Sequence, residues 1–480
     1  MLDSRFAIAL LCGLGFLIPP SSARTLTLSE LAQALLRKNP DLISRRTAVE
    51  EAQTEQKGVG RLNTPSLTAN TLYTGIHNED QSLPAKTDQK QMQLDAAVTG
   101  RLYRWGLGYS LSYAYANQKQ DPFLTFPSVQ KDGETVTLGV EYDLFRDAGF
   151  RVGALPVTLA AQKVKAATVE QRATIQNLSF DLVGRYLRVW ATQAQIDSAK
   201  AILLEAEDLK KHYKALFDEG RVSKVEYLSS EVQVATLHSA VQALNSLHKQ
   251  QMRELLAFSG AADDAKSEDM AVEPLPVDYI TAEKVDGLRA SAERRGNGDV
   301  LALEAERRVF ETEVEDLANK ALPSVKLVGG KSWVKNVPNE SVLSESDVRS
   351  DRWFVGVKLA MPLDGLGPRT DVAAKRVEAG GVAAKQKALS ESIDTRVHGL
   401  FLELTALDEQ LKTTQELERL NNERFQATLP LLERMSTARL DIFDFQNQLR
   451  EERARIAEIQ SAILRARAEI LYLNGTLQLR

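Results

Sequence analysis

A short segment from the middle of this chain recurs, without a gap, near its end, and this repeat is the strongest constraint on the fold. Residues 216–231 (LFDEGRVSKVEYLSSE) align with residues 431–446 (LLERMSTARLDIFDFQ), which places Asp441 at the position of Glu226. In both copies small and polar residues interrupt a helical pattern, and an apolar, acidic pattern then begins, as expected where one helix ends and a capped helix starts. Each segment is therefore predicted to be the elbow of a helical hairpin, and the repeat fixes the architecture.

A second pair of matching segments shows that the period is half of the protein. The helical pattern 27–56, for which we expect Ser29 as the cap, aligns with the pattern 281–320 at a constant offset of 258 residues. In this alignment Asn39 matches Asn297, and each helix stops just before a proline. An acidic, proline-containing stretch separates the two copies and is typical of a linker. These observations divide the chain into a first repeat (24–259), an acidic linker (260–280) and a second repeat (281–480).

The N-terminal residues 1–23 are predicted to be a signal peptide. Arg5 precedes an apolar run, 6–18, and small residues then suggest cleavage after Ala23. The run is short of the ~20 residues that a membrane-spanning helix needs. Cys12 is the only cysteine, so we expect no disulfide. No later stretch is apolar enough for a spanning helix, so a membrane-embedded chain would have to span as a barrel.

Composition favours long helices and argues against nucleic-acid binding. Of the 480 residues only 6% are aromatic, whereas 43% are hydrophobic and 26% are charged. The formal net charge is −5, and nucleic-acid-binding proteins usually carry a clustered basic face. The five histidines (His77, His212, His238, His248, His398) have no metal-ligand spacing, and no nucleophile or phosphate-binding motif is present. We therefore expect no enzyme activity, no metal and no cofactor.

Alternating apolar and polar residues predict strands in both repeats. The clearest runs are 136–144 in the first repeat and 353–361 in the second, with a weaker run near 324–334. The first repeat has 43 surplus residues, which contain two more alternating runs, 94–102 and 107–115. The segment that starts at Ser66, which aligns with the run at 324–334, is a further candidate, so four strands are expected from the first repeat and two from the second. Alternation over about ten residues suits a transmembrane barrel strand, but also a sheet packed on a soluble core.

Two very long helices follow the strands. The patterns 154–219 and 369–434 each cover 66 residues, which corresponds to about 100 Å of helix. Apolar residues spaced by three and four, such as Val397, Leu400 and Leu404, form a seam for a neighbouring helix. Helices of this length are expected to pack side by side as hairpins.

The order of these elements, repeated and followed by LYLNGTL at 471–477, resembles the TolC-type outer-membrane efflux proteins. The resemblance covers essentially the whole mature chain. It implies a fold that is mainly α with β, in which long helical hairpins form a helical barrel and antiparallel strands contribute to a shared trimeric transmembrane β-barrel. It further implies a homotrimer in outer-membrane lipid that spans the periplasm and meets a periplasmic adaptor protein and an inner-membrane transporter.

The resemblance also assigns roles at the elbows, which would form the periplasmic tip. Asp441 and Asp444 match an acidic pair that would ring the pore and favour cations, and Glu226 matches a possible gate acid. Alternatively, both aspartates simply stabilise a helix start. The positions that match where adaptors dock are Gly220, Arg221, Val222, Ser223, Ser436, Thr437 and Ala438. These residues also suit ordinary turn and capping chemistry. Leu432 and Thr437 stand where the family's type member has a Tyr and an Arg that lock the closed tip, so closure here must differ.

Three functions are compatible with these patterns. The first is a passive duct for small molecules in a tripartite efflux system, driven by an inner-membrane pump. The second is the outer-membrane component of a type I protein-secretion system. The third is a secreted coiled-coil scaffold without a pore, which would have no use for alternating strands.

The surplus strands make a further prediction about the sheet. If residues 92–116 insert into it, each protomer contributes six strands and a trimer eighteen, in place of four per protomer in the usual member. The alternative is a hairpin outside the membrane. We favour insertion, because both surplus runs present one continuous apolar face.

Overall fold

The structure is a computed structural model, and it describes most of the chain. The described residues are 25–60, 65–80, 85–102, 105–121, 129–146, 154–261, 270–273, 296–339, 348–361, 367–428 and 437–477. The predicted signal peptide and most of the predicted linker lie outside these ranges.

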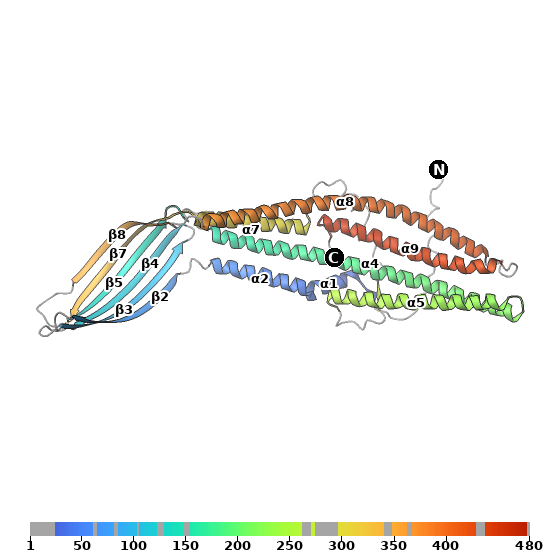
Figure 1. Ribbon diagram of the computed structural model, residues 1–480, viewed down its shortest axis with the longest axis horizontal. Coiled ribbons are helices and arrows are strands. Elements are labelled where there is room, and N and C mark those ends of the chain that lie inside the picture. The colour runs from blue at the N-terminus through green and yellow to red at the C-terminus, as the bar shows by residue number, and fades with distance from the viewer. Residues whose placement is uncertain are drawn as a thin grey trace, which may run out of the picture. The chain divides into compact units, whose positions relative to one another are not determined.

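The chain divides into two compact units that interleave along the sequence. Unit 1 comprises residues up to Ile43, Ile175–Gly296 and Asp394–Arg480, and unit 2 comprises Ser44–Thr174 and Asn297–Ile393. The long helices α4 (Leu155–Asp218) and α8 (Gly367–Thr428) each pass through both units (Figure 1).

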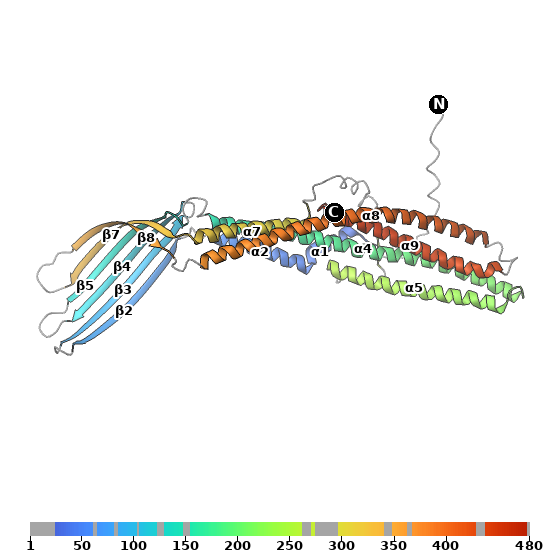
Figure 2. The same cartoon turned by 45° about the horizontal axis from the view of Figure 1, so that its top comes forward.

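Unit 2 contains one antiparallel sheet of six strands, in the order β2-β3-β4-β5-β7-β8 (Figures 1 and 2). The strands are β2 (Ser66–Asp80), β3 (Ala85–Leu102), β4 (Leu107–Asp121), β5 (Val129–Asp143), β7 (Ser324–Asn339) and β8 (Val348–Ala360). The two surplus runs of the first repeat are β3 and β4, and both pair with their neighbours along their length. β5 pairs with β7, so the strands of the two repeats form one continuous sheet.

The helical part of unit 2 repeats one arrangement in each half of the sequence. In the first half α2 (Pro40–Gly60) is linked to α4 by an ion pair between Arg45 and Glu170, at 2.5 Å. In the second half α7 (Gly298–Lys320) is linked to α8 by Lys375, which lies 3.3 Å from Glu313 and over the ring of Phe310. The repeat seen in the sequence is thus a repeat of helix pairs.

Unit 1 is built from two helical hairpins, α4 with α5 (Lys224–Ser259) and α8 with α9 (Thr437–Leu473) (Figure 1). α1 (Leu28–Lys38) packs against α5, and the short strands β1 (Thr25–Leu26) and β6 (Ala271–Val272) pair in parallel. The Tyr186 hydroxyl donates its hydrogen to the carbonyl of Glu273 and lies 3.3 Å from the carbonyl oxygen of Leu26, which fixes this strand pair to α4. Burial raises the pKa of the Tyr186 hydroxyl well above its ordinary value, so it remains a donor.

An apolar core joins all four long helices next to the first elbow. Its members are Ile202, Ala206, Leu209, Tyr213, Leu216, Val222, Leu237, Phe425, Ile442 and Leu449. On α4 these side chains recur every three or four residues, which is the spacing of a coiled-coil seam. Such a seam is what the long heptad patterns predicted, and it holds the two hairpins together.

Helix capping corrects two details of the prediction for the first helix. The first helix is capped by Thr27, in a capping box with Glu30, and the expected cap Ser29 lies inside the helix. The expected continuous helix is broken at Asn39, because Pro40 starts a new helix and has no backbone N–H to continue the old one. The Asn39 side chain accepts a hydrogen bond from Asp41 N at 2.9 Å.

The matching helix of the second repeat begins in the same way. α7 starts at Gly298, and the Asn297 side chain accepts hydrogen bonds from Asp299 N and Val300 N. The prediction that one helix runs from 281 to 320 is therefore wrong at Asn297, whose extended backbone caps a new helix. Residues 281–295 lie outside the described ranges.

Replacing Asn297 with alanine is expected to loosen the first turn of α7 by about 1 kcal/mol, because two backbone N–H groups lose their acceptor. Hydrogen exchange of the amides of residues 298–301 should then accelerate about fivefold, which is the factor that 1 kcal/mol corresponds to. Asn297→Asp is the matched control, since its carboxylate can accept the same hydrogen bonds. Equal exchange in wild type and Asn297→Ala would contradict the capping role.

Candidate functional site

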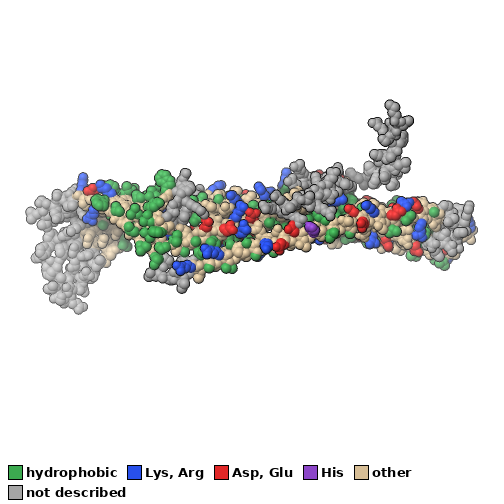
Figure 3. Space-filling model, turned by 90° about the horizontal axis from the view of Figure 1, so that it is seen from above, with side chains coloured by type: hydrophobic (Ala, Val, Ile, Leu, Met, Phe, Trp, Pro, Cys, Tyr) green, Lys and Arg blue, Asp and Glu red, His purple; other side chains and the backbone are tan. Residues whose placement is uncertain are grey.

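One face of the six-stranded sheet is mainly apolar, and its apolar residues extend from edge to edge. Directly paired residues of antiparallel strands share a face, so the pairing carries this face across all six strands. Its members include Leu67, Tyr73, Met92, Leu94, Val98, Leu107, Tyr109, Leu111, Tyr113, Val136, Leu138, Val140, Tyr142, Leu327, Trp333, Trp353, Val355, Val357 and Leu359. Figure 3 shows hydrophobic side chains gathered over this part of the protein. A contiguous exposed apolar surface of this extent marks a surface for lipid or for another protein.

Aromatic side chains lie near both ends of this face. Trp333 and Trp353 lie at one end, close to the charged pair Lys331 and Asp351, whose side chains are 2.9 Å apart. At the other end Trp105 is 66% exposed in the turn between β3 and β4, and Phe145 follows β5 with 62% exposure. Aromatic rings at the borders of an apolar band are typical of proteins that span a lipid bilayer as strands.

The opposite face of the sheet is mostly polar or small, and it carries a cluster of charges. Arg101 on β3 forms an ion pair with Asp143 on β5, and Lys326 on β7 lies 2.9 Å from Glu141 and 4.0 Å from Asp143. Asp143 is only 3% exposed. These charges join three strands, and partners for a buried carboxylate lower the cost of its burial. Sequence reasoning missed this cluster, because only the strand register reveals which charges face one another.

The first elbow ends α4 with a left-handed glycine and starts α5 with a capping box. Gly220 has φ +73°, and Arg221 N donates to Leu216 O at 2.9 Å, as in a Schellman motif. Ser223 caps α5, and the Glu226 carboxylate accepts hydrogen bonds from the Ser223 backbone N–H and hydroxyl. The predicted gate acid is thus also a structural part of the helix start. Val222 is buried in the core described above, whereas Arg221 is exposed and lies 3.3 Å from Glu219.

The second elbow is described only in part. Ser436 and Leu432 lie outside the described residues, and Thr437, Ala438 and Asp441 are described as backbone within the first turns of α9. Asp444 is exposed on α9, next to Phe443, whose ring stacks on Tyr213 of α4 at 5.7 Å. The structure therefore brings α9 to the same core as Val222, and it places Asp444 on the solvent side of that core.

Polar side chains also occur inside the helix packing near the elbows. Gln233 on α5 donates to Asn447 on α9 at 3.1 Å. The adjacent Gln446 is fully buried, and neither polar atom of its side chain has a hydrogen-bond partner in the described part of the chain. Unpaired buried amides cost stability, so this stretch of the seam is weaker than an apolar one.

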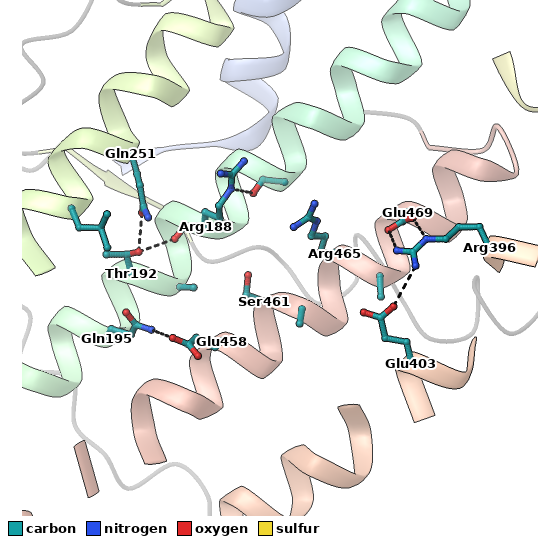
Figure 4. Close-up of a pocket in the computed structure, with 15 residues that line it drawn as sticks. Arg188, Thr192, Gln195, Gln251, Arg396, Glu403, Glu458, Ser461, Arg465 and Glu469 are labelled. Atoms are coloured by element: carbon teal, nitrogen blue, oxygen red, sulfur yellow. Dashed lines mark hydrogen bonds and ion pairs between the residues drawn. The ribbon is translucent and has the colours of Figure 1, made fainter. Parts of the chain in front are cut away.

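A pocket of about 540 Å³ lies between α4, α5, α8 and α9 in unit 1 (Figure 4). Hydrogen bonds and ion pairs cross it: Thr192 donates to Gln251, Gln195 donates to Glu458, and Arg396 binds Glu469 through two bonds of 2.6 and 2.9 Å. The hydrogen bond to Glu469 raises the pKa of Arg396 above its already high ordinary value. Because these partners come from all four helices, the pocket residues brace the two hairpins.

His248 on α5 is a buried titratable group. Its ring is 9% exposed, and Nε2 has no hydrogen-bond partner among the described residues. Burial lowers the pKa of His248 below its ordinary value; nearby Asp197 opposes this shift and Lys200 adds to it. The folded protein therefore favours the neutral ring.

The described residues lack two further features. No group of three or more His, Cys, Asp or Glu side chains there could hold a metal ion. None of the helices in the described ranges is both long and apolar enough to cross a membrane.

Comparison with known proteins shows what this arrangement resembles. The family model described as outer membrane efflux protein matches residues 290–476. The outer-membrane channel OprN has a TM-score of 0.66 and 15% sequence identity, with 93% of this chain and 89% of that chain covered. The outer membrane protein VceC from Vibrio cholerae has a TM-score of 0.64 and 13% identity, with 93% and 96% covered. The CmeC outer membrane channel from Campylobacter jejuni has a TM-score of 0.64 and 11% identity, with 94% and 85% covered.

The fold is therefore that of outer-membrane channels of known structure. The family match covers the second repeat, and the likeness to the solved channels extends over nearly the whole chain. No curated protein matches it in sequence.

Replacing Gly220 with alanine is expected to destabilise the first elbow by about 1 kcal/mol or more, because a side chain strains a left-handed backbone. Gly399→Ala is the matched control: Gly399 lies within α8, and an added Cβ there meets nothing within 4 Å. That change should stabilise its helix by roughly 0.5–1 kcal/mol. Hydrogen exchange around each site measures both effects, and shifts of the same sign would contradict the assignment.

The protein is expected to lose stability as the pH falls below about 6.5, since the unfolded chain then binds a proton that folded His248 resists. His248→Gln should reduce the drop in melting temperature between pH 7.5 and pH 5.5. His238→Gln, at an exposed position of the same helix, is the control. An unchanged pH dependence in His248→Gln would exclude His248 as its source.

Proposed function

We propose that this chain is the outer-membrane channel of a tripartite efflux system, working as a passive duct that an inner-membrane pump supplies. The observation that carries the proposal is the six-stranded sheet with one apolar and one mostly polar face. Strands of this kind can face lipid on one side and water on the other when they close into a barrel. A secreted scaffold would leave the apolar face exposed to water, which soluble proteins avoid.

The proposed assembly is a homotrimer in which the strands of three chains share one barrel in the outer membrane. Export by the N-terminal signal peptide would bring the chain to that membrane. A single chain has two open sheet edges, and unpaired backbone groups are too costly in lipid for it to span the membrane alone. The family match over residues 290–476 and the fold support this assembly.

The elbows are the proposed contact with a periplasmic adaptor, and through it with the inner-membrane transporter. Gly220, Arg221 and Ser223 are exposed at the first elbow, and Ser436, Thr437 and Ala438 belong to the second. Val222 anchors the first elbow in the core, so an adaptor would meet a turn of fixed shape.

Asp441 and Asp444 are the proposed acidic ring of the pore. They are three residues apart on α9, and such side chains share a helix face. Three chains would bring six carboxylates to one constriction, where confined like charges attract cations. Glu226 would add to this field at the start of α5, where its carboxylate is held by Ser223.

Deleting the gene should sensitise cells to lipophilic toxins, and the purified protein should run as a detergent-resistant trimer. Loss of secretion of one particular protein, without toxin sensitivity, would assign the chain to a type I secretion system instead. A monodisperse water-soluble monomer would overturn the channel proposal.

The double variant Asp441→Asn/Asp444→Asn is expected to lose cation selectivity and block by multivalent cations in planar bilayers, since the field at the constriction weakens. Asp408→Asn/Glu409→Gln removes the same charge from the middle of α8 and is the control. If the selectivity of the first variant equals that of the control, these aspartates lie outside the pore constriction.

A further inference from the structure

We propose that three copies of this chain close an eighteen-stranded sheet, in which β8 of each copy pairs with β2 of the next in one of two registers. The proposal rests on the trimer proposed above and adds its interface and its width. Its basis is the geometry of the two sheet edges and of the apolar band between them.

The two edge strands of the sheet, β2 and β8, have features that are typical of an interface. β2 and β8 are 15 and 13 residues long, and each has a hydrogen-bonded neighbour on one side only. Soluble proteins protect such edges with charges or prolines. β2 has no charged residue between Ser66 and Gly75, and β8 has only Lys358 between Trp353 and Ala360. Edges with so few charges in these stretches are suited to pairing with another strand.

Side-chain exposure points to the same conclusion. On the apolar face Leu67 of β2 is 72% exposed and Val357 of β8 is 65% exposed. Residues of the same face on inner strands are less exposed, for example Leu111 at 48% and Leu138 at 45%. The inner residues are covered by strands on both sides, so the edge residues each lack one neighbouring strand.

The edges are also complementary in direction. Every neighbouring pair in the sheet is antiparallel, and the number of strands is even. β8 therefore runs opposite to β2. A second copy placed beside the first meets it with antiparallel strands, as in the rest of the sheet.

The apolar band shifts along the strands from one edge to the other. On β2 the apolar residues run from Leu67 to Tyr73, so the band there is centred on Asn70. The chain of directly paired residues that starts at Asn70 crosses the sheet and ends at Ser350 of β8. The band on β8, however, is centred on Gly356, six residues further along. The shift is about one residue per strand, always in the same sense. A band that lies flat in a membrane therefore requires tilted strands.

The tilt that follows is the tilt of a closed barrel. With a rise of about 3.3 Å per residue and about 4.8 Å between strands, one residue per strand corresponds to a tilt of about 35°. Transmembrane barrels have tilts of roughly 35–45°. The sheet of a single copy thus already has the stagger that closure needs.

The same geometry limits the register between copies. The apolar side chains of β8 and of the next β2 must lie on the same face of the sheet. A shift of one residue between the two strands would put them on opposite faces, so the band shifts by zero or two residues. Val357 then lies opposite Ala69 or opposite Thr71 of the next copy. The two registers give overall tilts of about 35° and about 42°, both in the transmembrane range.

Eighteen strands make a wide outlet. At these spacings and tilts the backbone diameter is about 35 Å. The inner face carries small side chains at its centre, such as Ala97, Ser112 and Ala114. An α-helix with its side chains is about 10–12 Å across. Within the band the sheet would therefore admit a folded helical peptide, and selection by size must occur elsewhere in the channel.

Cysteine crosslinking in the lipid-reconstituted full-length protein tests the register. In a Cys12→Ser background, Ala69→Cys/Val357→Cys or Thr71→Cys/Val357→Cys should oxidise to covalent rings of three chains on a denaturing gel. Directly opposed residues have the separation that a disulfide requires. Asn70→Cys/Val357→Cys is the matched control, because its side chains point to opposite faces, and it should stay monomeric on the gel.

Failure of both test pairs in an assembled protein, or covalent rings of two or four chains, would overturn the eighteen-stranded closure. An electron cryomicroscopy map that shows fewer than six membrane strands per chain would do the same. The conductance of the same preparations is measured in a separate experiment, so that the closure and the channel function are tested independently. Conducting protein without crosslinks refutes only the closure, whereas crosslinked rings that do not conduct refute the channel function.

Discussion

Backbone hydrogen bonding in the sheet is the constraint on which the rest of this structure depends. Each strand must satisfy its N–H and C=O groups through its neighbours, and β5 meets β7 for this reason although the two belong to different repeats. This single pairing places both halves of the sequence in one sheet. It also leaves β2 and β8 as the edges, and so determines which surfaces remain to be covered in the proposed assembly.

The two faces of the sheet carry different kinds of side chain. The apolar face has the aromatic borders expected next to lipid, while the polar face buries Asp143 between Arg101 and Lys326. A buried carboxylate is tolerated only with partners, so these charges link β3, β5 and β7 where the strands approach the helices. β3 belongs to the surplus hairpin, which is thereby tied electrostatically as well as by its backbone to the rest of the sheet.

The long helices are held by a seam that is mainly apolar and contains polar side chains at several places. Next to Val222 the seam is filled by Tyr213, Phe425 and Ile442. Around Thr192 and Glu469 hydrogen bonds and an ion pair join the helices beside buried apolar residues such as Leu400 and Ile470. The core around Val222 gives the turn at Gly220 a fixed base.

The sequence by itself determined the repeat, the helical hairpins, the elbows and six strands, because periodicity and turn chemistry are local properties. It also indicated that the surplus runs of the first repeat are strands, and the sheet contains them as β3 and β4. Local signals failed at helix starts: Ser29 and Thr27 are both good caps, and only the backbone geometry selects Thr27. The sequence alignment matched Asn39 with Asn297. Only the helix breaks in the structure show that both residues cap a new helix. The tertiary structure alone decided the order of the strands, the cluster around Asp143 and the shift of the apolar band, because these depend on register between residues far apart in the chain.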